Sequence, residues 1–90
     1  MKVQLCVIDN GFVYVGRASI QTIEGKEFLV ILNGFNVRKA GTTKGFGQLA
    51  FSGPIKDSAL DPCPPVLVPY NRVCHFIECV EEKWECVKPM

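Results

Sequence analysis

The sequence is dominated by short stretches in which apolar and polar residues alternate, and a period of two is typical of β-strands. Such stretches cover residues 2–8, 12–20, 27–32, 35–40, 48–52, 66–68 and 72–80. Turn-forming glycines separate the first of them, at Asp9-Asn10-Gly11 and Glu24-Gly25. This spacing predicts an all-β fold, a small barrel or β-roll of about five to seven mainly antiparallel strands.

Three other segments carry local predictions. Gly16, in the middle of an expected strand, predicts a bulge or a close approach of another backbone. Residues 54–60 could form at most one short helical turn, since proline is tolerated at a helix start, and residues 61–65 contain three prolines that oppose regular strand pairing. Residues 84–87 form either a terminal strand or a single turn, with Trp84 sealing the core or anchoring a subunit contact.

The chain has 90 residues, which is enough for one domain, residues 1–90. Hydrophobic residues make up 48% of it and charged residues only 21%, so a small monomer would struggle to bury its apolar surface. The strand expected at residues 27–32 is apolar on both faces, which requires that both faces be covered. These two observations predict a homo-oligomer.

The formal net charge of +1 argues against strong binding to double-stranded DNA, which needs a dense basic surface. No apolar run is long enough to cross a membrane, and residues 1–11 do not resemble an export signal. We therefore expect a cytoplasmic protein without a membrane association, in which the cysteines are reduced.

Five cysteines and one histidine are the residues most able to carry chemistry. No two cysteines have the close spacing that a zinc site requires, so we expect small buried side chains and no metal, with a structural metal as the alternative. Cys74 and His75 are neighbours on an expected strand, so their side chains diverge, and His75 is expected to be a partly buried structural residue. Without a nucleophile and a base in reach, we predict no enzymatic activity and no cofactor.

The strongest polar feature is the segment Asn36–Gln48. It combines three glycines, whose backbone N–H groups can surround an anion, with three basic side chains and two threonine hydroxyls. Phe35 and Phe46 at its margins could stack on a base. The alternative is a flexible hairpin loop with solvated charges. The predicted ligand-binding residues are Asn36, Arg38, Lys39, Thr42, Thr43, Lys44, Gly45 and Gly47.

Residues 36–50, with Gly53-Pro54 and Leu60-Asp61, carry a resemblance to short β-barrel proteins of bacteriophages and prophages, a group without a defined activity. The resemblance runs over most of the chain. It implies a protein that acts in the host cytoplasm, by blocking a host defence protein, by sequestering a nucleotide-like immune signal, or as an accessory part of the virion or of replication.

These observations together predict a non-enzymatic, oligomeric binding module, which would hold an anionic nucleotide-like small molecule or a host protein. One alternative is a structural or assembly protein whose loop binds nothing small. Another is a weak binder of single-stranded nucleic acid, with Phe12, Tyr14 and Phe35 as stacking platforms.

Overall fold

The computed structural model describes all 90 residues and consists mainly of one antiparallel β-sheet with a single short α-helix. The expected all-β class is confirmed, whereas the sheet does not close into a barrel. The strands are β1 (Lys2–Ile8), β2 (Val13–Ile23), β3 (Lys26–Lys39), β4 (Ala59–Pro62), β5 (Val66–Pro69) and β6 (Val73–Glu78). The helix α1 spans Phe46–Ser52, and two 3₁₀ turns follow it, η1 (Tyr70–Arg72) and η2 (Glu81–Lys83).

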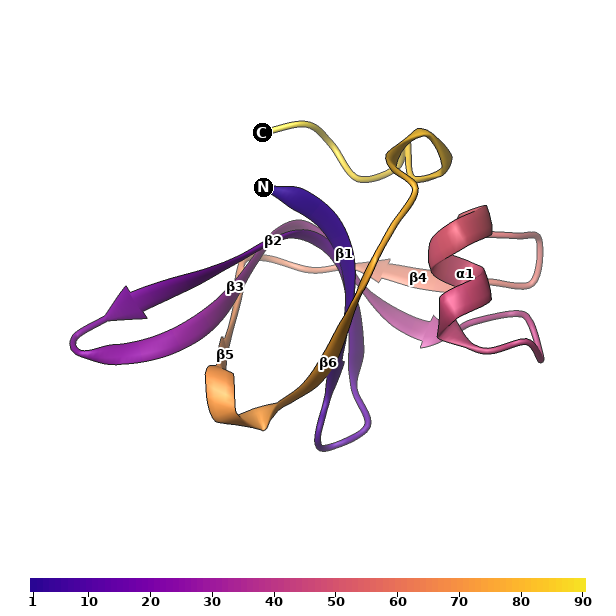
Figure 1. Ribbon diagram of the computed structural model, residues 1–90. Coiled ribbons are helices and arrows are strands. Elements are labelled where there is room, and N and C mark those ends of the chain that lie inside the picture. Colours follow the sequence, from indigo (N-terminus) through magenta and orange to yellow (C-terminus); the bar gives the residue numbers. More distant parts are fainter.

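The sheet has the order β4-β3-β2-β1-β6, and β5 pairs with β3 on the same side as β4. The first three strands form a meander joined by tight turns at the two predicted positions, where Gly11 and Gly25 have positive φ. Strand β3 is long enough to pair with β5 along its first half and with β4 along its second half. Figure 1 shows the β2–β3 hairpin reaching to one side of the molecule and α1 lying on the other.

The sheet bends where β2 and β3 cross at Gly16 and Gly34. A Cβ atom at Gly16 would lie 2.8 Å from the Cα atom of Gly34 and 2.7 Å from the side chain of Ile31. The pairing of β2 with β3 shifts its register between Val15 and Arg17. The predicted bulge and close backbone approach at Gly16 are both confirmed, because only glycine leaves room for the two strands at this point.

One face of the bent sheet packs beneath α1 and the C-terminal segment. Its core contains Leu5 and Val15 from the sheet, Leu49 from α1 and Trp84 from the C-terminal segment. The indole N–H of Trp84 donates to the carbonyl oxygen of Ala50 at 3.0 Å. Residues 84–87 therefore contribute to the core after a single turn, η2, rather than forming a further strand.

The opposite face forms a second core, which β5 and β6 cover from their two sides. Cys6, Leu29 and Ile31 are fully buried there, and Val68 of β5 and Phe76 of β6 pack against them. Of the apolar residues 27–32, Leu29 and Ile31 are therefore covered within one chain, whereas Phe28 and Leu32 on the other face of β3 are partly exposed. Homo-oligomer formation stays a prediction.

Two local predictions are wrong. Residues 27–32 and 35–40 were expected to form separate strands, but β3 continues through Asn33 and Gly34, because Asn33 takes its positive φ of 53° within the strand. Residues 48–52 belong to α1 rather than to a strand, because Phe46, Leu49 and Ala50 share the helical spacing that buries one face.

The proline-rich region also differs from its prediction. Residues 55–58 form one hydrogen-bonded turn, in which the Ser58 N–H donates to the Ile55 carbonyl oxygen at 2.9 Å, and no helix forms there, as the limit of at most one helical turn allows. Contrary to the prediction for residues 61–65, β4 pairs with β3 as far as Pro62, which lies at the edge of the sheet, where its missing N–H costs no ladder bond. The molecule contains no helix that is long and apolar enough to span a membrane.

Candidate functional site

The predicted ligand-binding residues do not converge on one cavity. Asn36 and Arg38 line a hollow of about 230 Å³ beside Phe12, on one side of β3. Lys39, Thr42 and Thr43 line another hollow, of about 370 Å³, beyond the end of the strand. The segment Asn36–Gln48 therefore presents two shallow hollows.

Intramolecular partners already engage several of these side chains. The Arg38 guanidinium donates to both carboxylate oxygens of Asp61, at 2.9 and 3.4 Å, and this hydrogen bond and the charge of Asp61 raise the pKa of Arg38. The Asn36 amide donates to the carbonyl oxygen of Val13 at 3.4 Å. The Thr42 hydroxyl oxygen accepts the backbone N–H of Lys44 at 3.1 Å. Lys39, Thr43 and the Lys44 ammonium make no such contact and stay available.

Two of the glycines predicted to bind a ligand lie at the start of α1. Gly45 precedes α1 with a φ of 89° and Gly47 lies inside the helix, and a Cβ atom at either position would meet open space. Gly41 is the one that is required, because a Cβ atom there would lie 2.5 Å from the backbone of Asp57 and Ser58. The loop is thereby braced against the segment that leads to β4, which the hydrogen bond from the Ser58 hydroxyl to the Ala40 carbonyl at 2.6 Å reinforces.

The cysteines and the histidine are dispersed. All five thiols are free, and the structure brings together no group of three or more metal-ligating side chains. Cys6 is buried as expected, whereas Cys74 and Cys86 are exposed. Burial and the nearby Cys79 thiol raise the pKa of Cys6 to about 12. His75 is exposed on β6, so its predicted partial burial is wrong, because β6 is an edge strand.

A third concave feature is a groove between the first hairpin and β5. It has a volume of about 460 Å³, which lies in the range of natural ligand sites. Its floor is apolar and is formed by Ile8, Tyr14 and Val68, and the exposed edge of β5 forms one wall. Asn10 and Asn71 stand at its rim. This combination of an apolar floor with a few polar groups is typical of a binding site.

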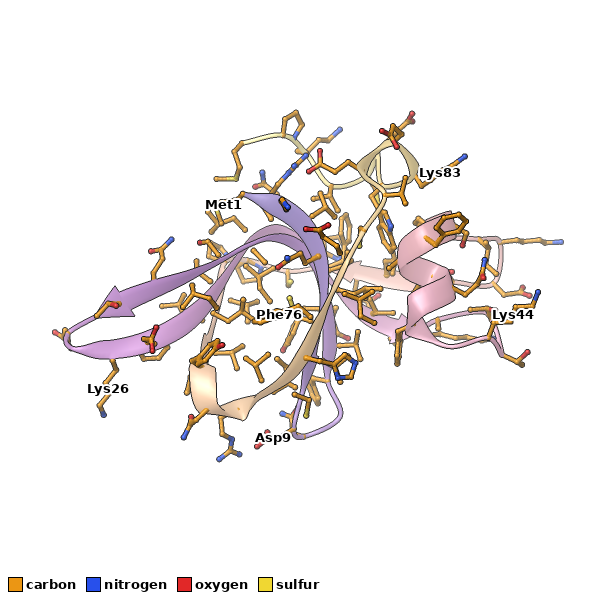
Figure 2. The ribbon with its side chains drawn as sticks, in the orientation of Figure 1. Met1, Asp9, Lys26, Lys44, Phe76 and Lys83 are labelled. Atoms are coloured by element: carbon orange, nitrogen blue, oxygen red, sulfur yellow. The ribbon has the colours of Figure 1, made fainter.

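Two contacts fix the wall of this groove. The Arg72 guanidinium and the Asp9 carboxylate form an ion pair at 2.9 Å, and the Asp9 backbone N–H donates to the carbonyl oxygen of Arg72 at 2.9 Å. The turn between β1 and β2 is thus tied to η1. Because the two charges neutralise each other, the rim has no net charge to offer an anion. Figure 2 labels Asp9 near η1 at the lower end of the molecule, far from Lys44.

Tyr14 supplies the aromatic surface of the groove. Partial burial, with a smaller contribution from the Cys63 thiol, raises the pKa of its phenol, so the hydroxyl is neutral at physiological pH and can donate a hydrogen bond. The Phe12 ring lies 6.2 Å from the Tyr14 ring, tilted by 47°. Phe35, the third expected stacking platform, packs instead against the core beneath α1.

The sequence interpretation missed this groove because its residues come from four separate segments. The hairpin β1–β2, strand β5 and turn η1 meet there only through the curvature of the sheet. The one local signal was the polar pair Tyr70-Asn71, which connects the strands expected at residues 66–68 and 72–80.

Comparison with known proteins identified no relative of this chain. No protein-family model matches the chain, and neither the curated proteins nor the solved structures contain a significant match.

Proposed function

We propose that this protein is a non-enzymatic binding module that holds a segment of a partner polypeptide in the groove between the first hairpin and β5. The observation that carries the proposal is the apolar floor of this groove, enclosed by a neutral and conformationally fixed rim. The groove lies beside the second core, to which Ile8 and Val68 of its floor belong.

The chemistry of the groove favours a polypeptide over an anion. An apolar side chain of the partner would displace water from Tyr14 and Val68, which is the main source of favourable free energy at such sites. The side-chain amides of Asn10 and Asn71 offer both donors and acceptors, which suit the backbone amides of a peptide. If the resemblance to phage proteins holds, the partner would be a host defence protein.

The test is selection of binders from a random peptide library displayed on phage, followed by mapping of the best peptide on the 15N-labelled protein. We expect the largest shifts of amide signals at Tyr14, Val68 and Asn71. Replacing Leu67, an exposed leucine in the groove wall, by serine should weaken binding at least five-fold.

The matched control is Ile20→Ser, since Ile20 is a similarly exposed aliphatic residue on a strand outside the groove. Binding should be unchanged in this variant. Enrichment of no peptide, or equal losses in the two variants, would refute the proposal.

A second candidate is the anion site predicted from the sequence, now reduced to Lys39, Thr43 and Lys44. The observation in its favour is that neither lysine has a carboxylate partner, although Asp57 lines the same hollow. A thermal-shift panel of nucleotides and cyclic dinucleotides tests it, since a ligand that binds the native state raises the Tm.

The double change of Lys39 and Lys44 to glutamine should abolish the thermal shift by an anion. Asp61→Asn releases Arg38, which lines the separate hollow beside Phe12, so this variant should leave the shift unchanged. Lys26→Gln, at the tip of the distant β2–β3 hairpin, is the control. If no anion of the panel raised the Tm by more than the scatter among measurements without ligand, this second candidate function would be refuted.

A further inference from the structure

One wall of the groove between the first hairpin and β5 is a strand that is paired on one side only. β5 pairs with β3 and with no other strand. All four residues of β5 line the groove, and residues of the β1–β2 hairpin line the opposite side. Figure 1 shows β5 beside β3, with η1 and the β1–β2 turn at the lower end of the molecule. A polypeptide in this groove therefore lies alongside an unpaired strand edge.

The hydrogen-bonding phase of the sheet determines which backbone groups of β5 face outward. Along an antiparallel strand, residues bonded to a given neighbour alternate with residues directed away from it. The two-residue turn Glu24-Gly25 has positive φ at both positions, so the flanking residues Ile23 and Lys26 form a hydrogen-bonded pair. Counting along β3 from Lys26, Leu29 and Ile31 direct their backbone groups away from β2 and toward β5.

Leu67 is the residue of β5 whose N–H and C=O are both left without a strand to bond. Val68 lies opposite Leu29 and Val66 lies opposite Ile31, so the backbone groups of both valines face β3. Leu67, between them, directs its groups to the other side, and no turn or loop segment bonds them. The free edge therefore offers one donor and one acceptor on the same residue.

Prolines restrict pairing at this edge to a short stretch. Pro69, two residues after Leu67, has no N–H, and residues 64 and 65 before the strand are prolines as well. Antiparallel pairing is the more stable of the two orientations per residue. In that orientation a partner strand forms both bonds to Leu67 with one of its own residues, which we call position n.

The side chains on either side of position n would face the floor of the groove. Side chains directly opposite one another on paired strands lie on the same face of the sheet. Val66 and Val68 face the second core, whereas Leu67 is exposed and faces away from it. Positions n−1 and n+1 therefore direct their side chains toward the floor, where apolar groups are favoured because they displace water from Ile8 and Tyr14.

The charges of the groove are matched to an uncharged segment. Asp9 and Arg72 are its only charged lining residues, and they form an ion pair with one another. A charged side chain at n−1 or n+1 would be buried without a partner. On the lip opposite β5, the Asn10 Oδ1 atom accepts the Phe12 N–H at 3.0 Å, so the Asn10 Nδ2 group is left to donate to a carbonyl of the partner.

Other open strand edges exist, along β6 and along residues 19–23 of β2. Openness alone therefore assigns no site. What favours β5 is that the free groups of Leu67, the apolar floor and the neutral rim belong to one groove. The other two edges serve as comparisons in the test.

We propose that the partner polypeptide binds as a short antiparallel β-strand on the outer edge of β5, with position n bonded to the backbone of Leu67 and with uncharged apolar side chains at n−1 and n+1. The inference rests on the proposed function, since it concerns the same groove, and it adds the conformation and the sequence pattern of the partner.

The test uses the best peptide from the display selection, synthesised with a single N-methyl group at each position in turn. Binding to the whole chain is measured by isothermal titration calorimetry. We expect a loss of about ten-fold when the N–H at position n is removed, since it donates to the Leu67 carbonyl. N-methylation at n−1 or n+1 should change the Kd less than about two-fold, and the enriched sequences should carry apolar residues at both of these positions.

Two variants at one position test the same bond from the side of the protein. Leu67→Ala and Leu67→Pro both remove the leucine side chain, but only proline removes the outward N–H, and neither affects the bonds of β5 to β3. Leu67→Pro should bind the peptide about ten-fold more weakly than Leu67→Ala. Circular dichroism checks that both variants are folded, and the N-methyl series gives the answer independently of this check.

The outcomes distinguish this inference from the proposed function. A peptide that maps to the groove but tolerates N-methylation at every position, or that binds Leu67→Pro and Leu67→Ala equally, would overturn the strand pairing and leave the groove as the binding site. Amide shifts centred on β6 or on residues 19–23, or a selection that enriches no peptide, would overturn both.

Discussion

The bend of the sheet depends on Gly16, and replacing this residue by alanine tests this dependence directly. The added Cβ atom would lie 2.7 Å from the Ile31 Cγ2 atom, 2.8 Å from the Gly34 Cα atom and 2.9 Å from the Leu32 carbonyl oxygen. Two of these three atoms belong to the backbone of β3, so no change of side-chain rotamer can relieve the overlap. The β2 and β3 strands must separate at the point where the two cores meet.

Overpacking of this kind costs about 1–3 kcal/mol, out of a total stability of roughly 5–15 kcal/mol for a domain. In a domain of this size each kcal/mol shifts the Tm by about 4–8 °C. We therefore expect the Tm of Gly16→Ala to fall by roughly 5–20 °C in a calorimetric or circular-dichroism melt, with a parallel loss in urea denaturation.

Gly47→Ala is the matched control. Gly47 lies in α1, and a Cβ atom there meets nothing within 4 Å. Alanine favours the helix over glycine by about 0.5–1 kcal/mol, so this variant should melt a few degrees above the wild type. A shift of about 2 °C is the scatter expected for a neutral surface substitution. If the Tm of Gly16→Ala differed from that of the wild type by no more than about this amount, the close approach of Gly16 to Gly34 would not determine the bend.

Three further predictions concern the cores and the thiols. Trp84→Phe should cost about 2–3 kcal/mol in urea denaturation, because it removes the buried hydrogen bond to Ala50 and part of the ring volume, and an unchanged midpoint would contradict this. The pKa of Cys6 is raised from 9.0 to about 12 in the folded state, so its thiolate forms at lower pH in the unfolded chain than in the folded one. The contribution of the neutral Cys6 thiol to the free energy of unfolding is therefore complete below pH 9 and decreases as the pH rises toward 12. From pH 8 to pH 10 this group should remove about 1.4 kcal/mol, a loss that Cys6→Ala should lack. In native protein at pH 8 a disulfide reagent should modify Cys74 and Cys86 within minutes and Cys6 only on unfolding, and fast modification of all five thiols would show that the second core is open.

Much of the strand structure could be predicted because it depends on local patterns. The alternation in residues 2–8 and 12–20 and the turns at Gly11 and Gly25 need only the period of two and a glycine with positive φ. The helix α1 was missed because its seven residues are too few for a clear helical period, and it is held by contacts with Trp84 and Val87 far along the chain.

Less of the candidate site than of the fold could be predicted from the sequence. Arg38, Lys39 and Lys44 were correctly recognised as a concentration of positive charge, but the sequence does not reveal that Asp61, 23 residues later, takes up Arg38. Nor can local patterns indicate that Gly45 and Gly47 lie at the start of α1.

The sequence by itself determined the class of the fold, the positions of the first turns and the bulge at Gly16, because these follow from backbone geometry within a few residues. Only the tertiary structure decided which surfaces are left for partners. Whether a charge is paired, a groove is formed or a strand edge is open depends on which distant segments come together, and here the bend at Gly16 and Gly34 brings β5 and β6 over one core and leaves the outer edge of β6 unpaired.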